Sequence, residues 1–170
     1  MKNPPHRVLI LCTGNSARSV LAEYLLREKS RGRFAVESAG SHPTGRVNPL
    51  AVRVLREKYG LEAGAARSKS WDEFRGTEFD LVITVCDHAR ETCPVWPGRP
   101  VLAHWGSPDP AAAQGSEEEK YRAFVNVASQ IARRVELFCA LPDDQLRNVA
   151  TVRAVGTQLP LDDEAAARRE

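Results

Sequence analysis

The sequence predicts an α/β fold: a central, mainly parallel sheet of four strands flanked by helices. Residues 7–11 (RVLIL) and 79–85 (FDLVITV) are short, β-branched and almost unbroken apolar runs, typical of strands buried on both faces of a parallel sheet. Segments with helical spacing separate the strands and favour right-handed crossovers. Ligands of such sheets bind beyond the carboxyl ends of the strands, which is where Cys12 and Cys86 stand.

Shorter patterns complete this prediction. Residues 33–38 (RFAVES) and 100–105 (PVLAHW) predict two flanking strands, the second opened by a proline, which suits the start of a strand. Apolar residues at helical spacing, capping residues and an acidic first turn predict the helices. These are expected at four places: residues 17–25, the stretch after Asn48 and Pro49, a short segment near Trp71, and a long segment from residues 115–120 (GSEEEK) to Leu141.

Length and composition limit the domain organisation and the partners. The 170 residues suit one domain, expected at residues 1–141, with residues 142–170 forming an extension made of a short helix and a charged tail. The 24 basic and 22 acidic residues are spread along the chain, so neither nucleic acid nor a membrane is an expected partner. No apolar run is long enough for a membrane helix, and the N-terminus lacks the apolar middle of a signal peptide. We therefore expect a monomer in the cytoplasm.

The stretch LCTGNSARS directly follows a predicted strand and carries the pattern C-x5-R. A loop from a strand into a helix directs successive backbone N–H groups inward and binds anions, and Gly14 and Asn15 permit the positive φ angles that such a loop needs. This field would hold Cys12 as a thiolate, while Arg18 binds two oxygens of the anion and Ser19 donates to the sulfur. The alternative is a chance spacing of a buried cysteine and a surface arginine, which the flanking strand and helix disfavour.

This loop resembles the phosphate-binding loop of the low-molecular-weight protein tyrosine phosphatase superfamily, in the form found in its thioredoxin-coupled arsenate reductases. The resemblance covers residues 7–141 in motif order. It implies a low-molecular-weight tyrosine phosphatase-like fold and a nucleophile at Cys12. It also implies a small oxyanion substrate, arsenate with phosphate or sulfate as mimics, bound by the loop residues Thr13, Gly14, Asn15, Ser16, Ala17, Arg18 and Ser19.

Two more cysteines follow the second central strand in the stretch VCDHARETCP. Two thiols in a short flexible segment, Cys86 and Cys93, can pass a disulfide along. A pair of core cysteines and half of a zinc site are the alternatives, but His88 is the one further zinc ligand within the segment. The segment is similar to the redox helix of the arsenate reductases, so the resemblance implies a disulfide relay from Cys12 to Cys86 to Cys93.

The stretch HWGSPDPA places an Asp-Pro pair after the last predicted strand. Asp109 resembles the superfamily's general acid, which protonates a departing oxygen, although Asp-Pro is also an ordinary turn. Tyrosine phosphatases of this superfamily usually have an aromatic residue after the pair, where this chain has three alanines, so the pocket suits a small oxyanion. The HWG triplet also matches the reductases, but no role follows for His104 or Trp105.

No cofactor is implied. Some members of the superfamily bind potassium beside the loop through residues matching Asn15, Glu23 and Ser38, and through an acid whose place Lys69 takes here. A lysine ammonium would repel the cation and could occupy its place. We therefore expect no potassium requirement and no metal site.

Together these features predict an arsenate reductase. By resemblance, Cys12 attacks arsenate bound by Arg18, Asp109 assists the loss of hydroxide, and Cys86 attacks Cys12 as arsenite leaves. The disulfide then passes to Cys93, and thioredoxin, glutaredoxin or a low-molecular-weight thiol reduces it. Two alternatives remain: a tyrosine phosphatase that uses the same loop and acid through a phosphocysteine, and a non-enzymatic oxyanion-binding or redox-sensing module.

Overall fold

The computed structural model describes residues 3–157. In these residues no helix has the length and apolar character needed to cross a membrane. The α/β fold class is confirmed, and the helix expected near Trp71 is a single 3-10 turn. The elements in chain order are β1 (His6–Cys12), α1 (Arg18–Ser30), β2 (Phe34–Gly40), α2 (Pro49–Tyr59), η1 (Trp71–Phe74), β3 (Leu81–Thr84), α3 (Asp87–Thr92), β4 (Val101–His104), η2 (Pro110–Ala112), α4 (Glu117–Cys139), η3 (Asp143–Arg147) and α5 (Val149–Thr157).

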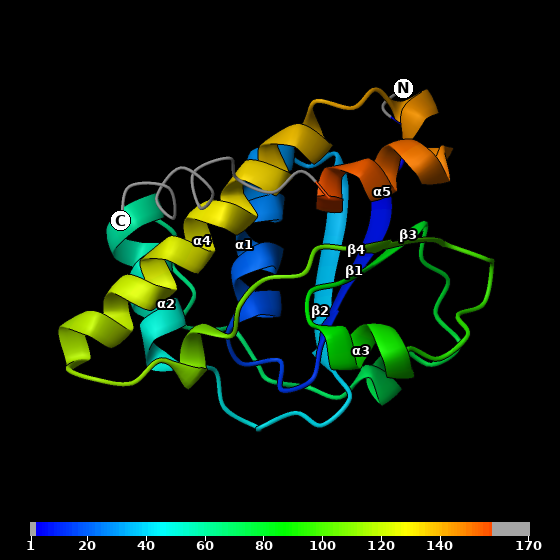
Figure 1. Ribbon diagram of the computed structural model, residues 1–170. Coiled ribbons are helices and arrows are strands. Elements are labelled where there is room, and N and C mark those ends of the chain that lie inside the picture. The colour runs from blue at the N-terminus through cyan, green and yellow to red at the C-terminus, as the bar shows by residue number, and fades with distance from the viewer. Residues whose placement is uncertain (1–2, 158–170) are drawn as a thin grey trace.

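The four strands form one fully parallel sheet in the order β2-β1-β3-β4 (Figure 1). The two unbroken apolar runs supply the inner strands, β1 and β3, because these strands are covered on both faces. Since all strands run the same way, their carboxyl ends meet at one edge of the sheet, where α3 and the loop after β1 lie (Figure 1). This edge brings Cys12, at the end of β1, to Cys86, which follows β3.

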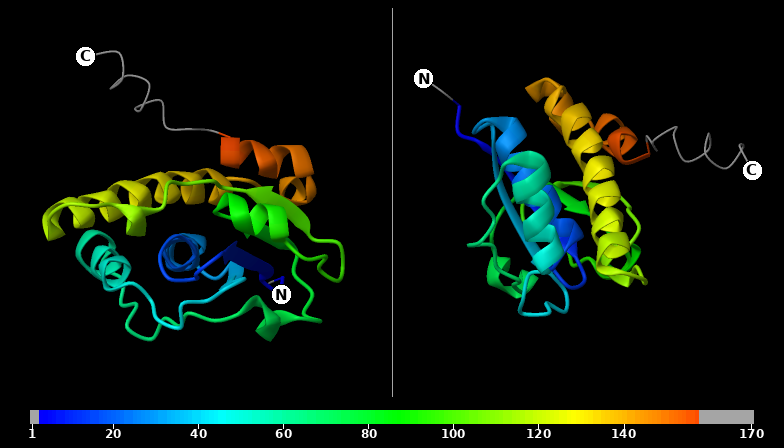
Figure 2. Two further views of the ribbon diagram at one scale, coloured as in Figure 1. Left: turned by 60° about the horizontal axis from the view of Figure 1, so that its bottom comes forward. Right: turned by 90° about the vertical axis from the view of Figure 1, so that its left-hand side faces the viewer.

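Helices α1 and α2 both pack against the long helix α4, and α1 also contacts β1 and β2 (Figures 1 and 2). The predicted stripe of α4 is buried at Phe124, Ile131 and Phe138. Trp105, directly after β4, is fully buried and meets Phe138 edge-on, with ring centroids 5.4 Å apart. Trp105 therefore holds the end of β4 against α4, a core role for which its sequence context carried no signal.

The segment after α4 returns to the sheet. Helix α5 packs against β4 and α4, and its Val152 and Val155 are buried (Figures 1 and 2). A Cβ atom at Gly156 would overlap the backbone oxygen of His104, so a glycine is needed for α5 to lie this close to β4. The short helix expected within residues 142–170 corresponds to α5, and the expected charged tail lies outside the described residues.

Candidate active site

The loop between β1 and α1 contains the residues expected to bind an oxyanion. Its carbonyl groups are engaged by neighbouring segments: the backbone oxygens of Cys12, Thr13, Gly14 and Ser16 accept hydrogen bonds from the backbone N–H groups of Ser41, His42, Thr44 and Asn48, respectively. Because the C=O and N–H of a trans peptide point in opposite directions, the N–H groups face the interior of the loop. This arrangement, at the N-terminus of α1, suits an anion.

The loop's conformation differs from the prediction in one respect. Asn15 has a positive φ of 45°, but Gly14 does not adopt the left-handed conformation expected for it. Gly14 instead provides space, because a Cβ there would lie 3.2 Å from the Thr44 side chain. Gly40, at the end of β2, was not predicted to matter. A Cβ on Gly40 would overlap the backbone oxygen of Thr13, so this glycine allows the loop to cross the end of β2.

Arg18 and Asp109 lie together although they are far apart in the sequence. The Arg18 side chain is only 14% exposed; its Nη1 donates to the backbone oxygen of Ser107 at 2.9 Å, and its Nη2 lies 3.9 Å from Asp109 Oδ2. Asp109 Oδ1 accepts a hydrogen bond from the backbone N–H of Ala111 at 3.0 Å and thereby caps η2. The expected general acid is therefore held beside the arginine expected to bind the oxyanion.

Arg134 of α4, which sequence reasoning missed, supports the loop that carries Asp109. It is buried, and its Nη1 donates to the backbone oxygen of Gly106 at 2.6 Å and to the Ser107 hydroxyl at 3.1 Å. Arg134 therefore fixes the position of residues 106 and 107. From this position the backbone oxygen of Ser107 also accepts the hydrogen bond from Arg18. The sequence held no signal for this, because Arg134 looks like one of many charged residues in a long helix.

Cys12 and Cys86 are both buried, and their thiols are close enough to influence each other's titration. The Cys86 sulfur also lies 3.3 Å from the hydroxyl of Thr13 and accepts a hydrogen bond from the backbone N–H of Ala89 at 3.4 Å. The interaction with the Cys12 thiol, aided by the hydrogen bonds from Thr13 and Ala89, lowers the pKa of Cys86 to about 5. The same interaction, together with burial, raises the pKa of Cys12 despite the nearby charge of Arg18.

The expectation that Cys12 is the thiolate stays a prediction, because the two thiols titrate together as a pair. When one of the two thiols loses its proton, the negative charge belongs to the pair, and the remaining proton can lie on either sulfur. The hydroxyl of Ser19, expected to face the Cys12 sulfur, accepts a hydrogen bond from the Asn15 amide at 2.8 Å. The Ser19 hydroxyl still has its own proton to donate, and the expected hydrogen bond from this hydroxyl to the Cys12 sulfur stays a prediction.

Cys93 lies apart from this pair, at the other end of α3. Cys86 caps the N-terminus of this helix with its sulfur, and Cys93 follows the last helical residue. At a rise of about 1.5 Å per residue, the helix separates the two by roughly 10 Å. A disulfide requires Cα atoms within about 7 Å. The Cys93 thiol is half-buried, and burial raises its pKa.

The structure shows a role for His104 that the sequence did not indicate: its side chain contacts two other polar side chains. Its Nδ1 lies 2.7 Å from the Thr84 hydroxyl, and its Nε2 lies 3.0 Å from Asp87 Oδ1. His104 therefore connects the ends of β3 and β4 to the first turn of α3. Thr84, Asp87 and His104 belong to β3, α3 and β4, respectively, so only the folded chain brings the three side chains together.

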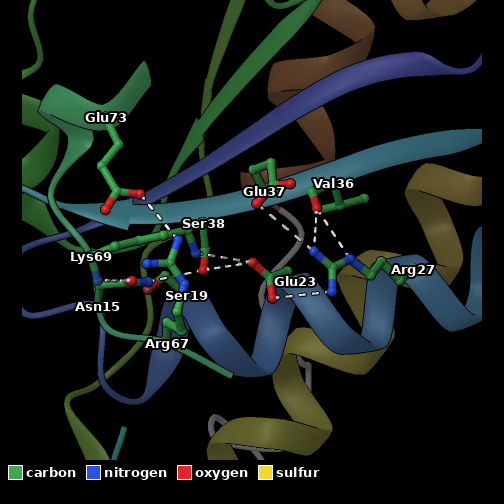
Figure 3. A network of polar contacts seen from close by, with 10 residues as sticks. All are labelled: Asn15, Ser19, Glu23, Arg27, Val36, Glu37, Ser38, Arg67, Lys69 and Glu73. Atoms are coloured by element: carbon green, nitrogen blue, oxygen red, sulfur yellow. Dashed lines mark hydrogen bonds and ion pairs between the residues drawn. The ribbon is translucent and has the colours of Figure 1, made fainter. Parts of the chain in front are cut away.

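Behind the loop, Asn15 joins a buried polar network (Figure 3). Its amide nitrogen donates to Ser38 at 2.9 Å, and its side-chain oxygen accepts from the backbone N–H of Lys69 at 2.9 Å. Ser38 donates to Glu23 Oε1 at 2.9 Å, and Lys69 Nζ lies 3.8 Å from that same oxygen. The network therefore contains its own cation.

The charges of this network are nearly enclosed by protein. The side chains of Glu23 and Lys69 are 5% and 8% exposed, and Arg27 lies 3.5 Å from the second oxygen of Glu23 (Figure 3). Burial raises the pKa of Glu23, and the charges of Arg27 and Lys69 oppose this rise. Within residues 3–157, no group of three or more His, Cys, Asp and Glu residues is arranged to hold a metal ion.

Comparisons with known proteins identify relatives of this chain. Residues 7–148 match the family "Low molecular weight phosphotyrosine protein phosphatase". The arsenate reductase of Halalkalibacterium halodurans is 38% identical over 131 residues, which are 77% of this chain and 93% of that protein. That of Bacillus subtilis has the same identity and the same coverage.

Solved structures agree with these sequence relatives. An arsenate reductase in the phosphate-binding state aligns with a TM-score of 0.68 at 27% identity, over 79% of this chain and 97% of that one. The arsenate reductase of Archaeoglobus fulgidus aligns with a TM-score of 0.63 at 34% identity, over 79% of this chain and 99% of that one. Both similarities extend over nearly the whole of the other chain.

Proposed function

Because this chain belongs to the low molecular weight phosphotyrosine protein phosphatase family, we propose that it is an arsenate reductase, the activity for which its relatives are named. The position of a second buried thiol at the oxyanion loop carries this proposal: the Cys86 sulfur lies 3.3 Å from the hydroxyl of Thr13, the residue after Cys12. Hydrolysis of a phosphate ester through a phosphocysteine needs one thiol. Reduction of arsenate needs a second thiol beside the first, because two electrons must leave the protein.

The first step forms a bond between Cys12 and arsenic. Arsenate lies in the loop, bound by backbone N–H groups and by Arg18. With the proton of the coupled thiol pair on Cys86, Cys12 is the thiolate. The Cys12 sulfur then attacks arsenic, and Asp109, as a carboxylic acid, protonates the departing hydroxide so that water leaves.

The second step transfers the electrons. The Cys86 sulfur, after losing its proton, attacks the Cys12 sulfur, a disulfide forms and the bond between sulfur and arsenic breaks. The electron pair of that bond stays on arsenic, which passes from the +5 to the +3 state and leaves as arsenite. The thiol pair has lost two electrons and its one proton, and Asp109 has supplied the proton that left with hydroxide as water.

The third step moves the disulfide away from the oxyanion loop. Cys93 attacks Cys86 in the Cys12–Cys86 disulfide and releases Cys12 as a thiolate. Since α3 holds Cys86 and Cys93 roughly 10 Å apart, this step requires α3 to unwind. A helix of six residues has little stability of its own. Thioredoxin, glutaredoxin or a low-molecular-weight thiol of the cytoplasm then reduces the Cys86–Cys93 disulfide.

The experiment that tests this function measures two activities of the same reduced protein. One assay follows arsenite formation with arsenate and either thioredoxin or glutathione as donor; the other follows hydrolysis of p-nitrophenyl phosphate. We expect arsenite equal to the donor oxidised, with weak hydrolysis. In Cys86→Ser, arsenite formation should stop while hydrolysis remains. Strong hydrolysis without thiol oxidation would indicate a phosphatase, and inactivity in both assays would indicate a binding or sensing module.

Potassium is not required under this proposal. The Lys69 ammonium lies within the network of Asn15, Ser38 and Glu23 and supplies a positive charge next to the Glu23 carboxylate (Figure 3). A buried carboxylate needs such a partner, and here the chain itself provides it. A second cation at the same place would meet the lysine charge at short range.

A further inference from the structure

A cavity of about 410 Å³ lies between α3, the strands β3 and β4, and α5. Cys93 is one of the residues that line it, and Val82 and Leu102 contribute apolar side chains from the two strands. This volume falls in the range of sites that bind small molecules, roughly 300–1,000 Å³. The thiol expected to end the relay therefore opens into a preformed space.

Arginines from two elements line the same cavity: Arg90 of α3 and Arg153 of α5. Arg153 donates through Nε to the backbone oxygen of Leu102 at 3.2 Å, which holds the guanidinium against β4. Arg90 lies 3.7 Å from Asp87, whose carboxylate also binds His104. None of the described residues that line the cavity is an aspartate or a glutamate. This charge distribution fits a ligand that carries carboxylates.

We propose that this cavity binds the electron donor of the enzyme, a small thiol that carries carboxylate groups, with its sulfur directed at Cys93. The inference rests on the proposed function, because only the relay leaves a disulfide at Cys93 to be reduced. Helix α5 begins at Val149, after the residues 7–148 that match the family. One wall of the cavity, formed by Arg153, Gly156 and Thr157, therefore lies beyond the residues that match the family, and none of the described oxyanion-loop residues lines the cavity.

The chemistry is two successive thiol–disulfide exchanges. The donor thiolate attacks the Cys93 sulfur of the Cys86–Cys93 disulfide, a mixed disulfide forms and Cys86 leaves as a thiolate. A second donor thiolate attacks the donor sulfur of this mixed disulfide, releases the donor disulfide and restores Cys93. Two donor molecules lose two electrons, equal to the number that arsenate gains.

The part of the binding surface that β4 and α5 supply does not depend on α3, which the relay requires to unwind. Leu102 belongs to β4 and Arg153 to α5, so neither depends on the helical state of α3. Thr84, which also lines the cavity, lies two residues before Cys86. A disulfide between Cys86 and Cys93 therefore remains next to the bound donor.

The first test measures binding without any redox chemistry. S-methylglutathione, which carries two carboxylates and cannot exchange with disulfides, is titrated onto the reduced full-length protein by calorimetry. We expect saturable binding that Arg153→Met weakens at least tenfold and Arg153→Lys weakens less. Arg56→Met, an exposed arginine of α2, is the matched control and should bind as the wild type does. No binding, or equal binding by Arg153→Met and Arg56→Met, overturns the proposal.

The second test separates failure of the donor site from failure of the proposed function. Reduced protein without donor should form about one arsenite per molecule in both the wild type and Arg153→Met, since the cavity plays no part in this step. With glutathione as donor, Arg153→Met should raise KM for glutathione at least tenfold, while turnover with uncharged 2-mercaptoethanol stays the same.

The outcomes can be told apart. Absence of the first arsenite refutes the reductase, and the binding measurement then still decides whether the cavity holds such a thiol. A normal first arsenite followed by turnover with thioredoxin but none with glutathione overturns the small-thiol site alone.

Discussion

The hydroxyl of Thr13 lies 3.3 Å from the Cys86 sulfur and stabilises its thiolate. Thr13→Val removes this hydrogen bond and should raise the pKa of Cys86 from about 5 by roughly one to two units, because a hydrogen bond to a charged group contributes about 1.5–3 kcal/mol. The thiolate forms as pH rises through the pKa, so the variant should hold less thiolate between about pH 4 and 7, and the two proteins should become similar again above about pH 8.

Thiolate absorbance at 240 nm, compared with Cys86→Ser to isolate the signal of Cys86, measures this shift. Thr13→Ser keeps a hydroxyl and should restore the wild-type titration. An unchanged midpoint in Thr13→Val would mean that the hydroxyl does not contribute to the charge of Cys86.

Arg18 is nearly buried and already donates to the Ser107 backbone, so its guanidinium has a fixed orientation. Arg18→Lys keeps the charge but loses the planar pair of donors, and we expect kcat/KM for arsenate to fall by roughly 10- to 100-fold. Arg31→Lys, at the exposed end of α1, is the control. A loss of less than tenfold in Arg18→Lys would contradict a two-oxygen contact with arsenate.

Lys69 can be tested through the stability of the protein. The melting temperature of the wild type should be equal in potassium and sodium chloride at the same ionic strength. Lys69→Gln removes the buried cation next to Glu23 and should destabilise the fold by up to about 3–5 kcal/mol. Potassium, more than sodium, should then restore part of the loss. A potassium-specific rise in the wild type would contradict the role given to Lys69.

At the scale of elements, the sequence predicted what depends on local patterns. The apolar runs of β1 and β3 and the buried stripe of α4 indicated their elements directly, because burial sets the period of the apolar residues. Helix α3, DHARET, has no apolar stripe, and only the resemblance suggested a helix there. Its start depends on the Cys86 sulfur acting as a cap, a role that the usual capping residues do not reveal.

The packing of α5 on β4 predicts that replacing a helical glycine by alanine destabilises the protein, the opposite of the usual effect. In a free helix, glycine to alanine stabilises by about 1 kcal/mol. At Gly156 the added methyl group would overlap the backbone oxygen of His104, so Gly156→Ala should instead destabilise the protein, by about 1–3 kcal/mol. Urea unfolding measures the difference.

Gly64→Ala is the matched control for this substitution. A Cβ at Gly64 meets no atom within 4 Å, so this variant should leave the free energy of unfolding nearly unchanged. A stabilised Gly156→Ala would show that α5 does not lie against β4 in solution, and the cavity beside Cys93 would then lose one of its walls.

At the scale of the whole molecule, the parallel sheet explains why two distant thiols meet. Cys12 and Cys86 follow adjacent strands whose carboxyl ends share one edge, which the pattern of strands already indicated. The coupling between the titrations of the two thiols could not be predicted, since it depends on how closely the folded chain places them. The sites of Gly40, Arg134 and Arg153 could not be predicted either, because each contact joins segments remote in sequence.

The central proposal is the disulfide relay from Cys12 through Cys86 to Cys93, and Cys93→Ser tests it most directly. Chemistry up to arsenite release needs only Cys12 and Cys86, so the reduced variant mixed with arsenate should release about one arsenite per protein and then stop. Cys139→Ser, which alters the one cysteine outside the relay, is the control and should turn over normally with donor.

Peptide mapping by mass spectrometry of the stopped Cys93→Ser protein decides the matter. We predict a Cys12–Cys86 disulfide in stoichiometric amount, together with one equivalent of arsenite. Unimpaired multiple turnover of Cys93→Ser with thioredoxin, or arsenite release without a Cys12–Cys86 link, would contradict the relay.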